Sequence, residues 1–143
     1  MVVLKVVVNV IDASVAVKWL LPEPGSDAAA ALLDSGEQLI APALIRIEVT
    51  AAILRKVRMQ EIDARDGAVA FRLWLQCLVD GVITLVPDDV HLVAAWAIAL
   101  RLKHPLQDCL YLALAESRRA VLITADKKFA AHDASGKRIQ LLK

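Results

Sequence analysis

Four carboxylates stand where the sequence predicts that they converge in the folded chain. Asp12 directly follows the apolar run "VVVNVI", and Asp126 comes two residues after "AVLIT". Glu48 lies in "LIRIEVTAAIL" and Asp108 in "LQDCLYLALAE", two segments of helical pattern whose other residues are mostly apolar. A charge within an apolar helix is costly unless it is paired or bound to a cation. These four acids are therefore the candidates for acid–base or metal chemistry.

Each of these acids also has a purely structural interpretation. Asp12 and Asp126 can cap the helices that follow them, and Asp108 gains from the dipole of its helix. Glu48 shares a helix face with Arg55, which lies two turns further on. Against these interpretations, several carboxylates gathered at one edge repel one another and raise their pKa values unless a cation neutralises them. A site of carboxylates alone selects hard ions such as Mg²⁺ or Mn²⁺, which clamp phosphates and activate water.

Apolar runs of strand length alternate with helical patterns along the chain. This alternation predicts an α/β domain with a mainly parallel sheet of about five strands, covered by helices on both faces. In such sheets ligands bind beyond the carboxyl ends of the strands. Ser26, Asp63 and either Asp88 or Asp89 are expected to cap three of the helices. The predicted strands are residues 2–11, 38–41, 82–86, 120–124 and 138–142. The predicted helices are residues 14–21, 26–34, 44–58, 63–80, 90–102, 106–117 and 128–134.

Size and composition bound the kind of protein. A chain of 143 residues predicts one compact domain over residues 1–143. The hydrophobic fraction is 58% and the mean hydropathy +0.55, yet no apolar run reaches the roughly 20 residues of a membrane span. We therefore expect no membrane insertion and interpret the apolar excess as a partner interface. Cys77 and Cys109 lack the spacing of a zinc site or a disulfide framework, which favours a cytoplasmic protein.

The charge is uneven along the chain. Residues 1–100 carry 8 basic and 12 acidic side chains, whereas residues 101–143 carry 9 basic and 4 acidic ones. A basic C-terminal third can face a polyanion. It can equally be an ordinary solvated surface, and charge alone does not separate the two interpretations.

Four segments together carry a family resemblance. "VIDASVAVKWLLPE", "IEV", "DCLYLALAE" and "LITADKKF" resemble, in order and spacing, the motifs of PIN-domain proteins, and in particular the VapC-type ribonuclease toxins. The resemblance runs from Val8 to Phe129. It implies a three-layer α/β/α PIN fold and a metal-dependent endoribonuclease that cleaves RNA with metal-activated water and without a covalent enzyme intermediate.

The resemblance also implies roles and partners. The acidic quartet of the family, which holds one or two Mg²⁺ or Mn²⁺ ions, and two small hydroxyl side chains beside it have counterparts here. The implied partners are an RNA substrate and a cognate antitoxin whose C-terminal segment covers the site, in a homodimer or a toxin–antitoxin hetero-oligomer. Operator DNA is bound only through the antitoxin. The matching acids are Asp12, Glu48, Asp108 and Asp126, and the matching hydroxyls are Ser14 and Thr124.

The sequence departs from the family pattern at two places. The family often has an Asn shortly after the Glu of its second motif, where this chain has Ala51 and Ala52, so an amide that steadies the site is missing. Cys109 replaces a usual alanine and is expected to be a core residue.

The alternative function is a catalytically silent PIN-like module that binds protein or nucleic acid. A phosphatase-like site is disfavoured because Ser14 stands where a second Asp is needed. A phosphate-cradling nucleotide domain is disfavoured because neither GxGxxG nor GxxxxGK occurs.

Three further residues are candidates for RNA contacts. His104 lies four residues before Asp108, and Lys127 and Lys128 directly follow Asp126. The alternatives are a loop histidine before a proline and two solvated lysines at a helix start. The three tryptophans lie among aliphatic neighbours, which favours core packing or an interface over base stacking.

Overall fold

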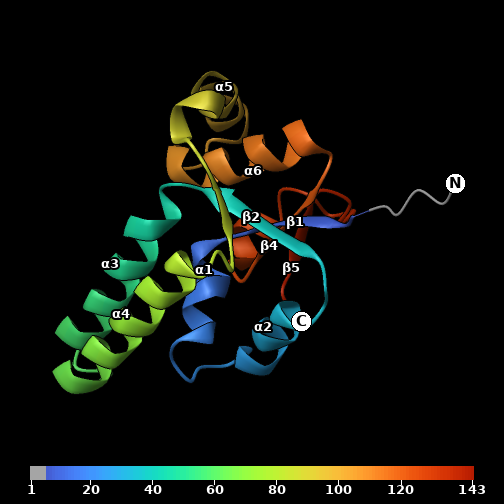
Figure 1. Ribbon diagram of the computed structural model, residues 1–143. Coiled ribbons are helices and arrows are strands. Elements are labelled where there is room, and N and C mark those ends of the chain that lie inside the picture. The colour runs from blue at the N-terminus through green and yellow to red at the C-terminus, as the bar shows by residue number, and fades with distance from the viewer. Residues whose placement is uncertain (1–5) are drawn as a thin grey trace, which may run out of the picture.

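The computed structural model describes residues 6–143, and within this range five strands form one parallel sheet (Figure 1). The strand order is β3-β2-β1-β4-β5, so β1 lies at the centre between β2 and β4. Because every strand runs the same way, all the carboxyl ends lie at one edge. The prediction of a parallel five-stranded sheet is thus confirmed. The strands are β1 (Val8–Ile11), β2 (Gln38–Pro42), β3 (Thr84–Val86), β4 (Val121–Thr124) and β5 (Ile139–Leu141).

Helices cover both faces of the sheet, which makes three layers. On one face α6 packs on β1, β2 and β4, and α5 packs on α6 (Figure 1). On the other face α1 packs on β4 and on α3, and α3 pairs with α4 (Figure 1). The helices are α1 (Ala13–Ala16), α2 (Ser26–Leu33), α3 (Ile45–Arg58), α4 (Ala64–Val79), α5 (Leu92–Leu102), α6 (Leu106–Arg118) and α7 (Lys127–Ala130), with short 3-10 helices η1 (Val17–Trp19) and η2 (Asp88–His91).

Helix α6 is the most buried helix of the domain. Seven consecutive residues, 109–115, are buried, among them Cys109 and Tyr111 with no exposed surface. A helix that is apolar all round is stable only when neighbours cover every face, here the sheet and α5. The core position expected for Cys109 is thus confirmed.

The predicted boundaries differ from the observed ones in physical detail. The first strand begins at Val8, and the part of its prediction before residue 6 lies outside the described residues. The predicted helix 14–21 is two short pieces, α1 and η1, with Val17 at the junction. Ser26 does not cap α2, because its hydroxyl accepts from the Glu23 backbone N–H while Gly25 holds the cap position at φ +90°. Asp63 does cap α4, accepting from the Asp66 N–H at 2.7 Å.

The three tryptophans separate into core and surface. Trp74 is fully buried and Trp19 is half-buried against the core, whereas Trp96 on α5 is 64% exposed. Val93 and Leu100 lie on the same helix and are also exposed, so α5 presents an apolar stripe. Within residues 6–143 no helix combines the length and the apolar character needed to cross a membrane.

Candidate active site

Asp12 and Thr124 meet because their strands are neighbours. Asp12 follows the last residue of β1, and its N–H donates to the Ile123 carbonyl of β4 at 3.1 Å. The Thr124 hydroxyl donates to Asp12 Oδ2 at 2.6 Å, and the Ser14 hydroxyl donates to the same oxygen at 2.9 Å. The Ser14 hydroxyl also accepts from the Ala125 N–H at 2.9 Å. The ends of β1 and β4 and the first turn of α1 thereby hold the Asp12 carboxylate in place.

Asp126 stands beside this pair and caps the short helix α7. Its N–H donates to Thr124 Oγ1 at 3.0 Å. Its Oδ1 accepts from the N–H groups of Lys128 and Phe129 at 2.9 and 3.3 Å. The capping interpretation of Asp126 is therefore confirmed. Both of these bonds end on Oδ1, so capping does not occupy Oδ2.

Asp108 lies in the first turn of α6 and contacts a histidine. His104 Nε2 is 2.7 Å from Asp108 Oδ2, and its Nδ1 is 3.2 Å from Nε2 of His132. The His104 ring stacks on Phe129, with centroids 4.5 Å apart. One ligand atom each from His104, Asp108 and Asp126 lie within 4.8 Å of one another. Two acids from distant parts of the chain thus share one small volume.

Glu48 is held in α3 by a tyrosine of α6. The Tyr111 hydroxyl donates to Glu48 Oε1 at 2.6 Å, across 63 positions of sequence. Burial, together with the negative charges of Asp12, Asp108 and Asp88, raises the pKa of Glu48 to about 7, against the lowering effect of the Tyr111 bond. Burial also raises the pKa of Tyr111, with the nearby Glu48 charge adding to the effect. Among the described residues Glu48 makes no ion pair with Arg55.

The electrostatics show that the acids converge. Burial raises the pKa of Asp12, the Thr124 and Ser14 hydroxyls lower it, and the charge of Asp108 raises it. Asp12 is only 6% exposed. Charge coupling therefore links Asp12, Glu48 and Asp108, and proximity joins Asp126 to them through Asp108. The structure brings together all four acids that the sequence singled out, with both hydroxyls.

Sequence reasoning missed two neighbours of the site. Tyr111 carried no signal, because its hydrogen bond to Glu48 joins α6 to α3 across 63 positions of sequence. Either Asp88 or Asp89 was expected to cap the helix after it, and this was wrong: neither η2 nor α5 has a side-chain cap, and Asp88 Oδ1 accepts from the Leu44 N–H at 2.9 Å, where α3 begins. Asp88 follows β3 two residues after Val86, so the rule that found Asp12 would also have found it.

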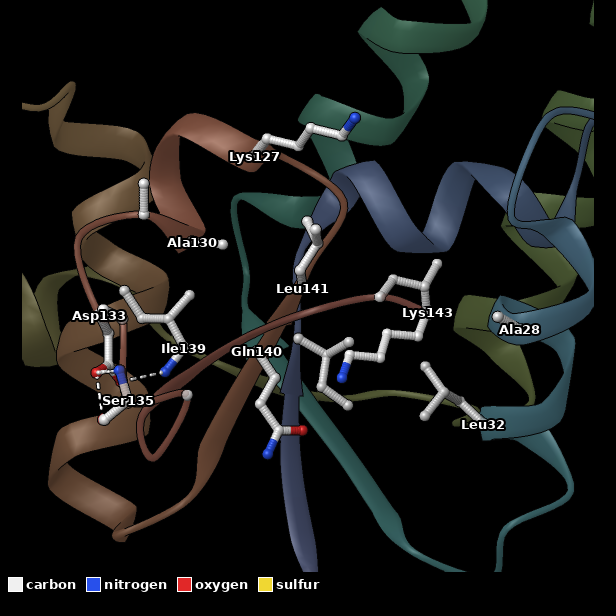
Figure 2. Close-up of a pocket in the computed structure, with 15 residues that line it drawn as sticks. Ala28, Leu32, Lys127, Ala130, Asp133, Ser135, Ile139, Gln140, Leu141 and Lys143 are labelled. Atoms are coloured by element: carbon white, nitrogen blue, oxygen red, sulfur yellow. Dashed lines mark hydrogen bonds between the residues drawn. The ribbon is translucent and has the colours of Figure 1, made fainter.

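The three predicted RNA-contact residues occupy different settings. His104 is largely buried, with 11% of its side chain exposed, whereas Lys127 and Lys128 are exposed at the start of α7. Lys127 also borders a cavity of about 730 Å³ between α2 and β5, where Leu141 and Lys143 lie (Figure 2). None of the four acids lines that cavity. It is therefore separate from the acid site.

Comparison with known proteins gives a consistent result. A family model described as "PIN domain" matches residues 10–134 of this chain. The chain is 35% identical over 133 residues to "Ribonuclease VapC12" of Mycobacterium tuberculosis, an alignment that covers 93% of this chain and 98% of that protein.

Solved structures share the fold. The crystal structure of PAE2754 from Pyrobaculum aerophilum matches with a TM-score of 0.69 at 19% identity, covering 93% of this chain and 83% of that chain. A chain of the toxin–antitoxin complex from Klebsiella pneumoniae matches with a TM-score of 0.62 at 16% identity, covering 92% and 95%. At such identities the likeness concerns the fold.

Proposed function

This chain belongs to the PIN domain family, and on that premise we propose that it is a VapC-type endoribonuclease, the toxin of a toxin–antitoxin pair. The observation that carries the proposal is the convergence of four carboxylates at the carboxyl edge of the sheet, two of them with raised pKa values. Folding has drawn together like charges that repel one another. An arrangement of this kind is typical of a site that holds a cation.

The residues present fit a divalent cation. Carboxylate oxygens are the ligands that Mg²⁺ and Mn²⁺ prefer, and we propose that one or two such ions are held by Asp12, Glu48, Asp108 and Asp126. When bound, such an ion supplies Lewis-acid polarisation of a phosphate oxygen and lowers the pKa of a water molecule. Our proposal assigns the four acids to this site as metal-binding and catalytic residues.

Hydrogen bonds from neighbouring side chains orient two of these acids for metal binding. Ser14 and Thr124 both donate to Oδ2 of Asp12, so Oδ1 accepts no side-chain bond from residues 6–143. Tyr111 donates to Oε1 of Glu48 in the same way. Each of these two carboxylates is thus oriented through one oxygen, and its other oxygen can bind a ligand. Hydrogen-bond partners orient metal-binding carboxylates in the same way. We propose Ser14 and Thr124 as positioning residues.

RNA binding would use the basic side chains near the acids. Lys127 and Lys128 are exposed directly after Asp126 and can pair with phosphates. We retain His104 as a candidate as well, although its ring is mostly covered. Few aromatic side chains are present, 4% of the chain, so we expect recognition of RNA shape more than base stacking.

The proposed partners are a cognate antitoxin and a second copy of the chain. A groove of about 320 Å³ between α3 and α4 is lined almost wholly by apolar side chains. We assign this groove to the antitoxin, because an apolar partner segment can bury its side chains there. The exposed stripe on α5 is our candidate for self-association. Operator DNA would be bound through the antitoxin.

We further propose that residues 1–143 form a single PIN domain and that the protein works in the cytoplasm. The family model spans most of the chain. Cys77 and Cys109 are free thiols within the described residues. Burial and the neighbouring Asp108 charge raise the pKa of Cys109 to about 11, so this thiol stays protonated, as suits a core residue.

The test is cleavage of RNA by the purified chain without antitoxin. Total cellular RNA is incubated with Mg²⁺ or Mn²⁺ and, separately, with EDTA. We expect discrete fragments that require metal and disappear with Asp12→Asn, while Asp27→Asn, a control in the first turn of α2, cleaves normally.

The alternative is a catalytically silent PIN-like binding module. Metal binding by calorimetry separates the two when no cleavage is seen. A wild type that binds metal, with binding lost in Asp12→Asn, indicates an active site that lacks its substrate. A wild type that binds no metal supports the silent module.

A further inference from the structure

A histidine stands inside the group of acids, although PIN-type motifs led us to expect an all-carboxylate site. His104 Nε2 lies 2.7 Å from Asp108 Oδ2, and one ligand atom each from His104, Asp108 and Asp126 lie within 4.8 Å of one another. Two atoms that bind one ion at 2.0–2.2 Å lie roughly 3 Å apart when they meet near a right angle. The His104–Asp108 separation is therefore within a few tenths of an ångström of what a shared cation requires.

The ring of His104 is held in place on two sides. It stacks on the fully buried Phe129 with an interplanar angle of 16°, and the edge of His132 meets it at a centroid distance of 5.1 Å. His104 Nδ1 is 3.2 Å from His132 Nε2. A histidine that binds a metal through one nitrogen commonly donates a hydrogen bond from the other, which fixes ring and tautomer. His132 is placed to accept that bond.

The contact between His104 and Asp108 can form in two ways. With the proton on Nε2, His104 donates to Asp108 and acts as a positioning residue. With the proton on Nδ1, His104 donates to His132, and the Nε2 lone pair then faces the Asp108 carboxylate. Two acceptors that face each other need a cation between them.

We propose that His104 uses the second form and supplies a nitrogen ligand to the divalent-cation site, so that this site prefers borderline transition metals to Mg²⁺. This inference rests on the proposed function, because it concerns the same site. Both imidazole rings stay neutral, and the number of protons on them does not change. His104 exchanges its Nε2 proton for one on Nδ1, and the exposed His132 moves its own proton from Nε2 to Nδ1 through solvent.

Ligand chemistry sets the consequence for metal selection. Carboxylates and water suit Mg²⁺, whereas imidazole suits later first-row metals, whose affinity for a given site rises from Mn²⁺ through Co²⁺ to Ni²⁺. Removal of one imidazole should therefore weaken Co²⁺ binding about tenfold or more and Mg²⁺ binding less than about threefold.

The direct test detects nitrogen bound to the metal. Mn²⁺ is added to the full-length protein without RNA, and electron spin echo envelope modulation is recorded. We expect modulation from a directly coordinated ¹⁴N, replaced by the ¹⁵N pattern when the protein is grown with ¹⁵N-histidine. This labelled wild type needs no substitution, so the result does not depend on a variant that folds.

Calorimetry with matched variants tests the assignment to His104. In His104→Gln the amide can still donate to Asp108 but has no nitrogen lone pair to offer a metal, so the positioning role is preserved and the nitrogen ligand is lost. His91→Gln is the control, because His91 is not part of the His104–Asp108–Asp126 group. Its Nε2 lies 3.5 Å from the hydroxyl oxygen of Ser117 on α6. We expect Co²⁺ affinity to fall only in the His104 variant, together with its nitrogen modulation.

Three results would overturn the proposal. Mn²⁺ that binds the wild type without histidine nitrogen modulation assigns His104 to positioning alone. Equal losses of Co²⁺ and Mg²⁺ affinity in His104→Gln lead to the same assignment. A wild type that binds no divalent metal removes the basis of both this inference and the proposed function, whereas metal-dependent cleavage without nitrogen coordination leaves the proposed function intact.

Discussion

Replacement of Glu48 by Gln should stabilise the metal-free protein at pH 8 and leave its stability at pH 5 nearly unchanged. Glutamine has almost the shape of glutamate, and its carbonyl oxygen can still accept the Tyr111 hydrogen bond, which is 2.6 Å long in the native protein. The substitution therefore removes the charge and keeps the packing. Its effect isolates the free energy that charge repulsion and burial cost the fold.

The magnitude follows from the pKa of Glu48. That pKa rises from its ordinary value of 4.5 to about 7, chiefly because the carboxyl is buried. An acid with a raised pKa contributes stability that is fully present below pH 4.5 and is lost as the pH rises through 7. At about 1.4 kcal/mol per pKa unit the loss reaches about 3 kcal/mol by pH 8. Relaxation around a partly exposed carboxylate reduces the expected difference to about 1–2 kcal/mol.

Urea unfolding in EDTA provides the assay. Fluorescence of the buried Trp74 reports the transition, and the free energy of unfolding is extrapolated to water at pH 5, 6, 7 and 8. Glu116→Gln is the control, because Glu116 is exposed and lies 4.0 Å from Arg101. A Glu48→Gln variant no more stable than the wild type at pH 8, or one whose advantage does not change with pH, would refute the reasoning.

Three further substitutions test the scaffold, each by its free energy of unfolding. Thr124→Val removes the buried hydroxyl that donates to Asp12 and should cost about 1–3 kcal/mol; an unchanged stability would contradict the importance of that bond. Gly67→Ala places a Cβ 2.5 Å from a methyl carbon of Val57, where α3 and α4 pack, and should cost about 1–3 kcal/mol despite a better helix propensity; a stabilised variant would contradict it. Asp133→Asn weakens four hydrogen bonds to the turn before β5, and hydrogen bonds hold the pKa of Asp133 at about 2. Its cost of about 1 kcal/mol near pH 7 should therefore shrink as the pH falls from 4 toward 2, and a constant difference would count against this cause.

The sequence predicted the parts of the site that depend on local pattern and topology. Asp12 and Asp126 follow apolar strands, and a parallel sheet brings such residues to one edge. Glu48 and Asp108 were singled out as charges in apolar helices, and the family resemblance joined them to the other two. The strand count and the direction of the sheet followed from the alternation of strands and helices.

What the sequence did not predict depends on packing between distant elements. The Tyr111–Glu48 hydrogen bond joins two helices that are far apart in the sequence, and a tyrosine in an apolar helix otherwise indicates core. His104 does lie in a loop before α6, as predicted, but its contacts with Phe129 and His132 could not be predicted, because they join segments about 25 residues apart. The prediction that Asp88 or Asp89 caps a helix was wrong for a different reason: an acid at a strand end also has the local character of a helix cap, and topology decides which role it takes.

The apolar core explains how this chain can hold like charges together. Asp108 and Tyr111 lie one turn apart on α6, so a single helix provides one acid of the site and the hydrogen-bond donor that orients another. Between and beyond them α6 is buried on all sides, and burial of its seven core residues contributes far more free energy than the few kcal/mol that acid repulsion costs. A less apolar α6 would relax away from the sheet edge, and the distance between Glu48 and Asp108 would grow. The hydrophobic composition of the chain is thus a condition for its electrostatics, because tightly packed elements can hold like charges near one another.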